Sequence, residues 1–385
     1  MRARLFQPYP ACRSPHSVPP EERVPCPVPV FFIRYRYAHH CAASGYDRLC
    51  DYVGETIALS RTLYWLGETV LRPAGICLAR AGGHFEYSRY DFILELEAMR
   101  HFLRRRNSVY HFVYAEKSYY LMSLLAGRNG NRLVGTVHHP PEHMPWLFRN
   151  ADHFRRLDLV VTVSRAQVAY WSELLGPERV RYVPYAVDTA YFRPLSAERN
   201  PSRQRLIFVG RHERDITLLA TLVPRLLDDI REAELVMISG DARCGSIAAS
   251  HPRAYWKRRV SDEEYLSFLQ SADLLILPLR RSTSSTAVLE ALACGVPVVT
   301  TRGGIEDYLS EECSCVTAPG DGDGMLECCR SLLRDRERLQ AMRRAARAQA
   351  MRFSWPETAR RMVALYAGLF GHTAEGAAAG STSER

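Results

Sequence analysis

Long apolar runs are missing from this sequence of 385 residues. A helix that crosses a bilayer needs ~18 consecutive apolar residues, and the best candidates here, residues 30–33 and 274–279, have the length of strands. The composition, 47% hydrophobic and 24% charged, is globular and excludes a fibrous or a disordered chain. At roughly 100–200 residues per domain, about two domains are expected.

Lysine is almost absent, since Lys117 and Lys257 are the only two among 51 basic residues. With 42 acidic residues the formal charge is +9. Such a charge suits anionic partners such as phosphates, nucleic acid or a lipid surface. No zinc-finger, aromatic RNA-binding or helix-turn-helix pattern is present, so we expect no nucleic-acid partner.

The spacings typical of zinc ribbons and of redox motifs are also missing, because no C-x-x-C occurs among the 11 cysteines. We interpret the cysteines as reduced thiols of a cytoplasmic protein. The alternative is a metal site that combines His39 and His40 with Cys41 and Cys50. Residues 1–27 carry charges and prolines where a signal peptide has an apolar core, and are predicted to be a disordered leader.

Strand-like apolar runs and helical periodicity alternate twice along the chain, which predicts parallel sheets covered by helices. We expect an α/β fold of two Rossmann-like doubly wound domains facing across a cleft, at residues 28–195 and 196–352, then a helix at 353–370 and a disordered tail at 371–385. The expected strands are 28–35, 109–114, 133–137, 157–163, 206–209, 233–239, 274–277 and 296–300. The expected helices are 47–70, 90–105, 216–230, 262–271, 287–294 and 330–350.

The loops that follow the strands are where such sheets bind ligands. Residues 281–286 (RSTSST) enter the helix at 287–294, and this run can cap the helix while leaving N–H groups for an anion. Glu290, one turn further on, can accept hydrogen bonds from vicinal hydroxyls such as those of a ribose. The alternatives are plain helix capping and a solvated carboxylate.

Three other loops carry candidate residues. Arg211 follows a strand, and its guanidinium can pair with a diphosphate. Ser44 and Gly45 follow the first strand and let the backbone approach a phosphate. His138 and His139 follow the strand at 133–137, where a histidine can exchange a proton or hydrogen-bond a sugar. A surface arginine, an ordinary turn and a structural histidine pair are the alternatives.

An Asp-Gly-Asp-Gly run at 321–324 could hold a metal against a diphosphate. It lacks the glutamate that a calcium loop needs, because residue 332 is leucine. We interpret the run as a surface turn away from the cleft, and we expect no metal and no other cofactor.

Several segments together resemble one family, the retaining glycosyltransferases of family 4, which have the two-domain GT-B architecture. Residues 288–309 (VLEALACGVPVVTTRGGIEDYL) are similar to the family's E-A-x-A-C-G-x-P-V-V signature and its G-G turn. Residues 183–194 (VPYAVDTAYFRP) are similar to its interdomain segment. Residues 208–211 (FVGR), 161–164 (VTVS) and 353–355 (FSW) resemble the start of its second domain, a strand end of its first, and the start of a last helix that packs back on the first domain.

The resemblance runs from about residue 28 to residue 370 and implies retaining transfer of a sugar from a nucleotide-diphosphate sugar to an unidentified acceptor: a glycan, a lipid-linked glycan or a small molecule. It implies front-face attack without a metal, in which a donor phosphate oxygen takes the acceptor proton. His138, Arg211 and Glu290 are the implied catalytic residues. The implied donor contacts are Ser44, Gly45, Arg211, Arg214, Ser284, Ser285, Thr286 and Glu290, and the implied acceptor contacts are His138, His139, Tyr46 and Glu116.

Two departures from the family pattern leave an alternative open. Ser282 stands where the family has its first glutamate, and the lysine that follows its Gly-Arg is missing, with Arg214 as a substitute. The alternative function is a catalytically weak or inactive homologue that binds nucleotide-sugars or glycans. A sugar-nucleotide epimerase shares the two-domain layout, but the GVPVV and FSW segments speak against it.

Residues 144–156 (MPWLFRNADHFRR) mix aromatic residues with arginines directly after the His138 loop. This pattern suits an interfacial helix that meets anionic lipid, and it gives the hypothesis of a peripheral contact at the inner face of the membrane. The alternative is a helix that packs its apolar side on the first domain.

Overall fold

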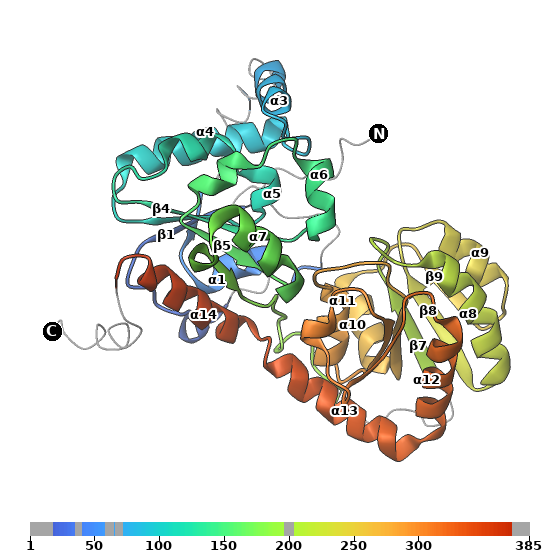
Figure 1. Ribbon diagram of the computed structural model, residues 1–385. Coiled ribbons are helices and arrows are strands. Elements are labelled where there is room, and N and C mark those ends of the chain that lie inside the picture. Colours follow the sequence, from blue (N-terminus) through green and yellow to red (C-terminus); the bar gives the residue numbers. More distant parts are fainter. Residues whose placement is uncertain (1–17, 35–40, 58–64, 66–71, 196–203, 372–385) are drawn as a thin grey trace. The chain divides into compact units, whose positions relative to one another are not determined.

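The computed structural model describes residues 18–34, 41–57, 65, 72–195 and 204–371. The chain divides into two compact units, the first formed by Met1–Tyr185 with Trp355–Arg385 and the second by Ala186–Ser354 (Figure 1). Each unit contains a six-stranded parallel sheet with helices around it, so the predicted fold class of two Rossmann-like units is confirmed. Residues 186–195, expected in the first domain, belong to the second unit, where Arg347 donates to the carbonyls of Thr189 at 3.0 Å and Phe192 at 2.9 Å.

The sheet of the first unit has the strand order β2-β1-β3-β4-β5-β6. Its inner strands are buried on both faces, because helices cover a doubly wound parallel sheet on both sides, and they therefore appear in the sequence as continuous apolar runs. The strands are β1 (Val30–Ile33), β2 (Glu55–Thr56), β3 (Val109–Phe112), β4 (Arg132–Val137), β5 (Leu159–Thr162) and β6 (Val180–Tyr182). The helices are α1 (Leu49–Tyr52), α3 (Arg72–Ala81), α4 (Arg89–Arg104), α5 (Ala115–Ser118), α6 (Met144–Leu147), α7 (Val168–Leu175) and α14 (Trp355–Gly368).

The start of the first unit differs from the sequence prediction in two places. The expected helix over 47–70 ends at Tyr52, and the edge strand β2 follows it; most of residues 58–70 lie outside the described residues. Residues 18–27 of the expected leader are ordered: Pro20–Glu22 forms a 3₁₀ turn, and the N–H of Val24 donates to the carbonyl of Tyr52 at 3.0 Å. Residues 1–17 and the tail at 372–385 lie outside the described residues.

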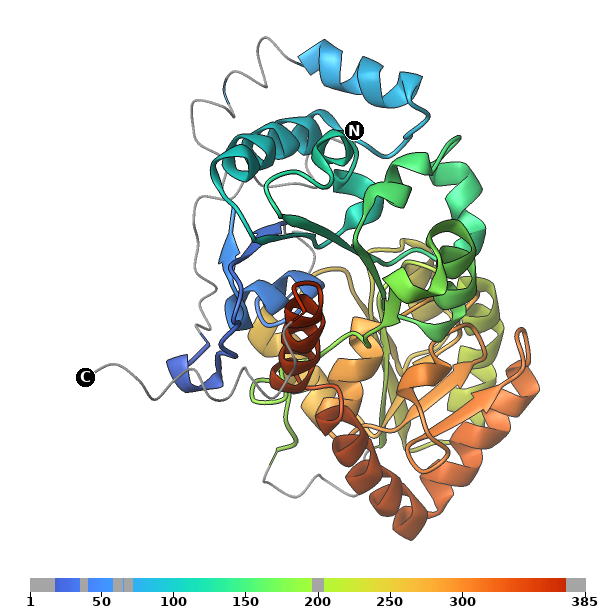
Figure 2. The same ribbon diagram turned by 60° about the vertical axis from the view of Figure 1, so that its left-hand side comes forward.

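The last helix, α14, belongs to the first unit and lies beside α1 (Figure 2). Tyr366 Oη lies 2.6 Å from His111 Nδ1 in β3, and Arg132 of β4 donates to the carbonyl of Leu369 at 3.2 Å. Trp355 at the start of α14 is buried and stacks on Tyr52 of α1. These contacts tie the C-terminal helix to the sheet and to α1.

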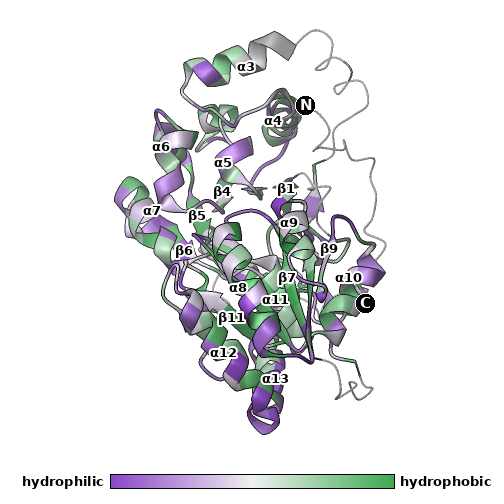
Figure 3. Ribbon diagram, turned by 90° about the vertical axis from the view of Figure 1, so that its right-hand side faces the viewer, coloured by the Kyte–Doolittle hydropathy of each residue, from purple (hydrophilic) through white to green (hydrophobic). Residues whose placement is uncertain are grey.

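The sheet of the second unit has the order β12-β11-β10-β7-β8-β9. Its apolar strands are covered by helices whose outer faces are polar, and this is clearest for α13 (Figure 3). The expected single helix over 330–350 is two helices that meet at Asp335, whose side chain caps the second one by accepting from the N–H of Arg338 at 2.9 Å. The strands are β7 (Gln204–Val209), β8 (Ala233–Ile238), β9 (Ala254–Lys257), β10 (Leu274–Leu277), β11 (Val298–Thr301) and β12 (Ser314–Thr317). The helices are α8 (Ile216–Asp229), α9 (Arg243–Ala249), α10 (Asp262–Ser271), α11 (Thr286–Ala293), α12 (Gly322–Arg334) and α13 (Arg336–Met351).

Each sheet has one point where the strand order reverses, between β1 and β3 in the first unit and between β7 and β10 in the second. Ligands of doubly wound sheets bind beyond the carboxyl ends of the strands at such a point, because the loops there diverge and leave a crevice. The loops after β1 and β3, and those after β7 and β10, are therefore the places to look for a site.

Candidate functional site

Arg214 joins the two loops at the reversal point of the second unit. Its guanidinium donates to the carbonyls of Val209 at 3.0 Å and His212 at 3.2 Å in the loop after β7, and to Ser285 Oγ at 3.3 Å in the loop after β10. Burial lowers the pKa of Arg214 to about 10, so the group stays protonated at neutral pH. A fixed positive charge therefore lies between the two loops, at a position that suits a diphosphate.

Arg211 lies in the same loop but extends into solvent. Its side chain runs past Gly240 after β8, where a Cβ would lie 3.7 Å from Arg211 Cδ. The loop after β7 thus presents one exposed and one partly buried guanidinium.

The loop before α11 does not cap its helix in the predicted way. Ser285 occupies the N-cap position without a side-chain bond to its own helix, and its hydroxyl accepts from Arg214 instead. Ser285 is buried, whereas Ser284 and Thr286 are half-buried. Ser282 is held by the loop after β11, where its N–H donates to the carbonyl of Gly303 at 2.5 Å.

The Gly-Gly turn after β11 has a steric reason. Gly304 has a φ of +96°, and a Cβ at this position would overlap the carbonyl oxygen of Ser282. Only glycine allows both the left-handed backbone and this close approach. The turn therefore fixes the loop that carries the serines and threonines.

Glu290 is a buried carboxylate in the second turn of α11 and not a solvated one. Tyr265 of α10 donates its hydroxyl to Glu290 Oε2 at 2.5 Å. A buried carboxylate held by a charge-assisted hydrogen bond is fixed in orientation, as a ribose contact requires. No motif marked Tyr265 in the sequence, because its link to Glu290 joins two different helices.

His138, at the end of β4, is a neutral histidine set among tyrosines. Its Nε2 lies 2.8 Å from the carbonyl of Val113, and a carbonyl only accepts, so Nε2 carries the proton. Burial lowers the pKa of His138 to about 3. Its ring lies 4.8 Å from that of Tyr114 and 5.0 Å from that of Tyr46. The ring is thus locked in one tautomer, with Nδ1 as its accepting nitrogen.

Glu116 and Gln167 hold the backbone of the His138 loop from two sides. Glu116 Oε1 accepts from the N–H groups of His138 and His139, the latter at 2.8 Å, and burial raises the pKa of Glu116 to about 7. Gln167 Nε2 donates to the carbonyls of Val137 at 3.1 Å and His139 at 2.9 Å. Glu116, expected as an acceptor contact, is thus buried beneath the loop. Gln167 was not predicted as a site residue, because no motif in the sequence marks it.

The loop after β1 brings Ser44, Gly45 and Tyr46 together, while residues 35–40, including His39 and His40, lie outside the described residues. Gly45 has a φ of +105°, so glycine is favoured there. Ser44 is buried, and its N–H donates to the carbonyl of Cys41 at 2.9 Å. Tyr46 is fully buried behind His138 and packs edge-to-face on Trp355, so it supports the histidine and has no exposed surface for an acceptor.

Asp321 and Asp323 are occupied away from the reversal point. Asp321 caps α12 by accepting from the N–H of Gly324 at 2.8 Å, and Asp323 pairs with Arg225 at 2.7 Å on the surface. Within the described part of the chain, no group of three or more His, Cys, Asp or Glu side chains could hold a metal ion. The described cysteines are free thiols.

The segment at 144–156 does not form the interfacial helix that its composition suggested. It is one α-helical turn, α6, followed by a 3₁₀ turn, and Leu147, Phe148 and Phe154 are buried. Trp146 is the one strongly exposed aromatic residue of this segment. None of the described helices has the length and apolar character of a membrane span.

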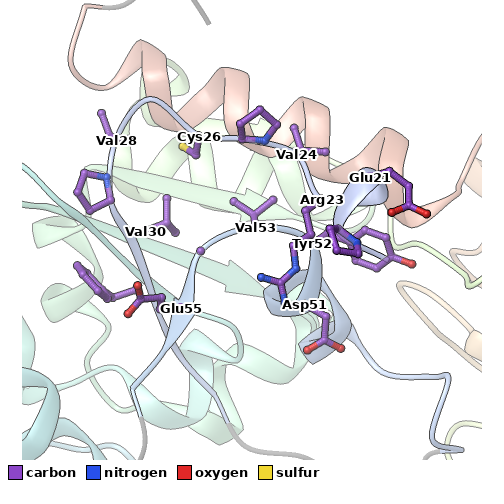
Figure 4. A pocket seen from close by; sticks show the side chains of 15 residues that line it. Glu21, Arg23, Val24, Cys26, Val28, Val30, Asp51, Tyr52, Val53 and Glu55 are labelled. Carbon is purple, nitrogen blue, oxygen red and sulfur yellow. The ribbon is translucent and has the colours of Figure 1, made fainter. Parts of the chain in front are cut away.

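A cavity of about 650 Å³ lies at the end of the first sheet where the strands begin, opposite the carboxyl ends that carry the candidate loops (Figure 4). Its lining includes Arg23, Val30, Asp51 and Glu55, and β1 and β2 begin there. The His138 loop follows the carboxyl end of β4, so this cavity is not part of the candidate site.

Both units match family models of known proteins. Residues 203–335 match the model described as "Glycosyl transferases group 1", and residues 68–191 match "Glycosyltransferase Family 4". The chain belongs to the family 4 glycosyltransferases. Of the residues matched above to the family pattern, Glu290 is buried and Arg211 is exposed, whereas Ser282 and Arg214 stand where the pattern has a glutamate and a lysine.

Curated relatives cover both units in part. A D-inositol 3-phosphate glycosyltransferase of Segniliparus rotundus is 28% identical over 63% of this chain and 59% of its own length. An MMP alpha-(1->4)-mannosyltransferase of Mycolicibacterium hassiacum is 27% identical over 55% of this chain and 54% of its own length. The chain thus spans a little over half the length of these relatives.

Solved structures share the fold of this chain. A sucrose-phosphate synthase from Thermosynechococcus elongatus superposes with a TM-score of 0.62 at 16% identity, covering 89% of this chain and 99% of its own. Anabaena HepE, solved in complex with UDP and glucose, superposes with a TM-score of 0.64 at 12% identity, covering 87% of this chain and 98% of its own.

Proposed function

We propose that this glycosyltransferase moves a sugar from a nucleotide-diphosphate sugar to an acceptor hydroxyl, with retention of configuration and without a metal ion. The observation that carries the proposal is the cluster at the reversal point of the second unit, where Arg214, Ser285 and Glu290 gather at the start of α11. Relatives named as transferases, and HepE solved with UDP and glucose, support the same assignment.

The donor contacts follow from charge and position. The guanidinium groups of Arg211 and Arg214 oppose the two negative charges of a diphosphate, and the N-terminal end of α11 adds a partial positive charge. Glu290, oriented by Tyr265, accepts hydrogen bonds from the ribose hydroxyls. These groups bind the leaving diphosphate more strongly as its negative charge grows, which lowers the barrier.

The reaction breaks the bond between the anomeric carbon and the phosphate oxygen and forms a bond from that carbon to the acceptor oxygen on the same face. The acceptor proton passes to an oxygen of the departing diphosphate, so no protein base is required. His138, neutral and locked by Val113, Glu116 and the tyrosines around it, is the group of the first unit that we assign to the acceptor.

The test is calorimetric titration with UDP, GDP and ADP. The proteins titrated are the parent and the variants Arg211→Ala, Arg214→Ala and Glu290→Ala. Loss of a charge-assisted contact worth about 1.5–3 kcal/mol weakens binding by roughly 10–150-fold. Arg231→Ala is the matched control, because Arg231 is an exposed arginine just before β8, at the amino-terminal edge of the same sheet.

Equal nucleotide binding by all four variants would contradict the donor site. Nucleotide binding without hydrolysis or transfer of any nucleotide-sugar would instead indicate a binding module, and would contradict the enzymatic part of the proposal.

A further inference from the structure

A row of three aromatic rings leads away from His138 along the surface of the first unit. The rings of His139 and His143 have centroids 5.9 Å apart, and His143 stacks on Trp146 at 5.2 Å with an interplanar angle of 19°. Trp146 is 73% exposed, more than any other large hydrophobic residue that the structure describes. One face of the indole is therefore backed by His143, and most of the ring is open to solvent.

The exposed indole stands on a fixed base. On either side of it in α6, Met144 and Leu147 are buried, and the carbonyl of Leu147 accepts from the N–H of Phe85 at 2.9 Å. Next to this bond, the N–H of Arg149 donates to the carbonyl of Gly83 at 2.7 Å. Little conformational freedom is lost when a ligand stacks on a ring held in this way.

The chemistry of the surface favours a sugar ring over a lipid. An aromatic face carries negative potential and attracts the weakly positive C–H groups on one side of a pyranose. Membrane association needs a broad apolar face. Within residues 144–156, Leu147, Phe148 and Phe154 are buried, and Trp146 is the exposed aromatic ring. The ring row also starts at His139, directly beside the histidine assigned to the acceptor.

We propose that Trp146, backed by His143, is a stacking platform for a sugar ring of the acceptor, so that the acceptor is a saccharide or glycoside. This inference rests on the proposed function and names the acceptor class that the proposed function leaves open. It also assigns a role to His143, which orients the indole from behind.

The experiment compares the parent with the Trp146→Ala, Trp146→Phe and Leu124→Ala variants. Leu124 is the control because it is 69% exposed in the same unit and belongs to the 3₁₀ turn Leu121–Leu125, away from the ring row. The probes are the methyl glycosides of α-glucose, α-mannose and β-galactose, with binding followed by saturation-transfer NMR and transfer followed by the acceptor KM. UDP and GDP binding is measured on the same samples.

Trp146→Ala should raise the Kd and KM for the methyl glycosides by about threefold to tenfold. Trp146→Phe should recover most of the loss, and Leu124→Ala should match the parent. Nucleotide affinity should be equal in all four proteins, because Arg211, Arg214 and Glu290 of the proposed donor site lie in the second unit, whereas Trp146 belongs to the first.

Three results would overturn the platform. They are unchanged glycoside binding in Trp146→Ala, a parent that binds nucleotide but no glycoside, and Trp146-dependent sedimentation with phosphatidylglycerol vesicles in the absence of glycoside binding. The reverse pattern, Trp146-dependent glycoside binding without nucleotide binding, would support the platform and refute the proposed donor site.

Discussion

Glu116→Gln and Gln167→Glu conserve the shape of the two side chains that hold the His138 loop and change only what they can donate or accept. In Glu116→Gln the amide oxygen can still accept from the N–H groups of His138 and His139. In Gln167→Glu the carboxylate can still accept from the N–H groups of Val163 and Ser164, at 3.0 and 2.9 Å in the parent, but it can no longer donate.

The magnitudes follow from this difference. Gln167→Glu leaves the carbonyls of Val137 and His139 without their donor and places a negative charge against both. At about 1–3 kcal/mol for each unsatisfied buried group, the free energy of unfolding should fall by about 2–6 kcal/mol. Glu116→Gln replaces two bonds to a carboxylate by two neutral bonds and should cost about 1–2 kcal/mol.

The assay is urea unfolding together with the rate of nucleotide-sugar hydrolysis, each measured from pH 5 to pH 8. Gln167→Glu should lose most of the hydrolysis rate at pH 8 and regain part of it at pH 5, because a protonated carboxyl can donate one hydrogen bond again. Glu116→Gln should keep its rate at both pH values. Equal damage from both exchanges, or no effect from either, would refute the role assigned to this pair.

Three further predictions concern the donor site and the buried charges. Tyr265→Phe removes the hydrogen bond to Glu290 and should weaken nucleoside-diphosphate binding by about tenfold, measured by calorimetry; parental affinity would separate Tyr265 from the donor site. Turnover should survive EDTA, and a loss that magnesium or manganese restores would add a metal to the mechanism. The third prediction concerns the pH dependence of stability. Burial lowers the pKa of four histidines to about 3–4, so below pH 6.5 protons bind mainly to the unfolded chain, at about 1.4 kcal/mol per pH unit for each. Burial also raises the pKa of three carboxyls to about 6–7. These carboxyls bind protons mainly in the folded chain, so they add stability as the pH falls, until the pH is below the pKa that they have in the unfolded chain. Four histidines against three carboxyls leave about one group uncompensated, so the free energy of unfolding should fall by about 2 kcal/mol between pH 6 and pH 4.5 and more steeply below pH 4.5. A urea midpoint that is constant down to pH 3.5 would contradict this. The four histidines are His84, His111, His138 and His153, and the three carboxyls are those of Asp91, Glu95 and Glu116.

The sheets could be predicted from the sequence because their inner strands are buried on both faces and therefore form continuous apolar runs. The strands β6, β9 and β12 escaped prediction because they lie at sheet edges, are short and have only one buried residue each, so they form no continuous apolar run. The break between α12 and α13 escaped because the apolar periodicity continues across Asp335, which ends one helix and caps the next.

At the candidate site, the positions of the loops were predictable but the partners of the side chains were not. Arg214, Glu290 and His138 follow strand ends that hydropathy and motifs mark in the sequence. Tyr265 and Gln167 act through contacts 25 to 30 residues away in the chain, and no local pattern encodes such contacts. The amphipathic appearance of 144–156 was misleading, because two short helical turns bury the residues that one helix would have exposed.

Retention of configuration without a metal is the central claim, and one NMR measurement tests it directly. A nucleotide-sugar that the protein hydrolyses is incubated with it in EDTA and methanol, and the anomeric proton coupling of the methyl glycoside is read, since a glycoside cannot mutarotate. We expect a product with the same anomeric configuration as the donor. A product of inverted configuration, or turnover that requires an added divalent metal, would contradict it.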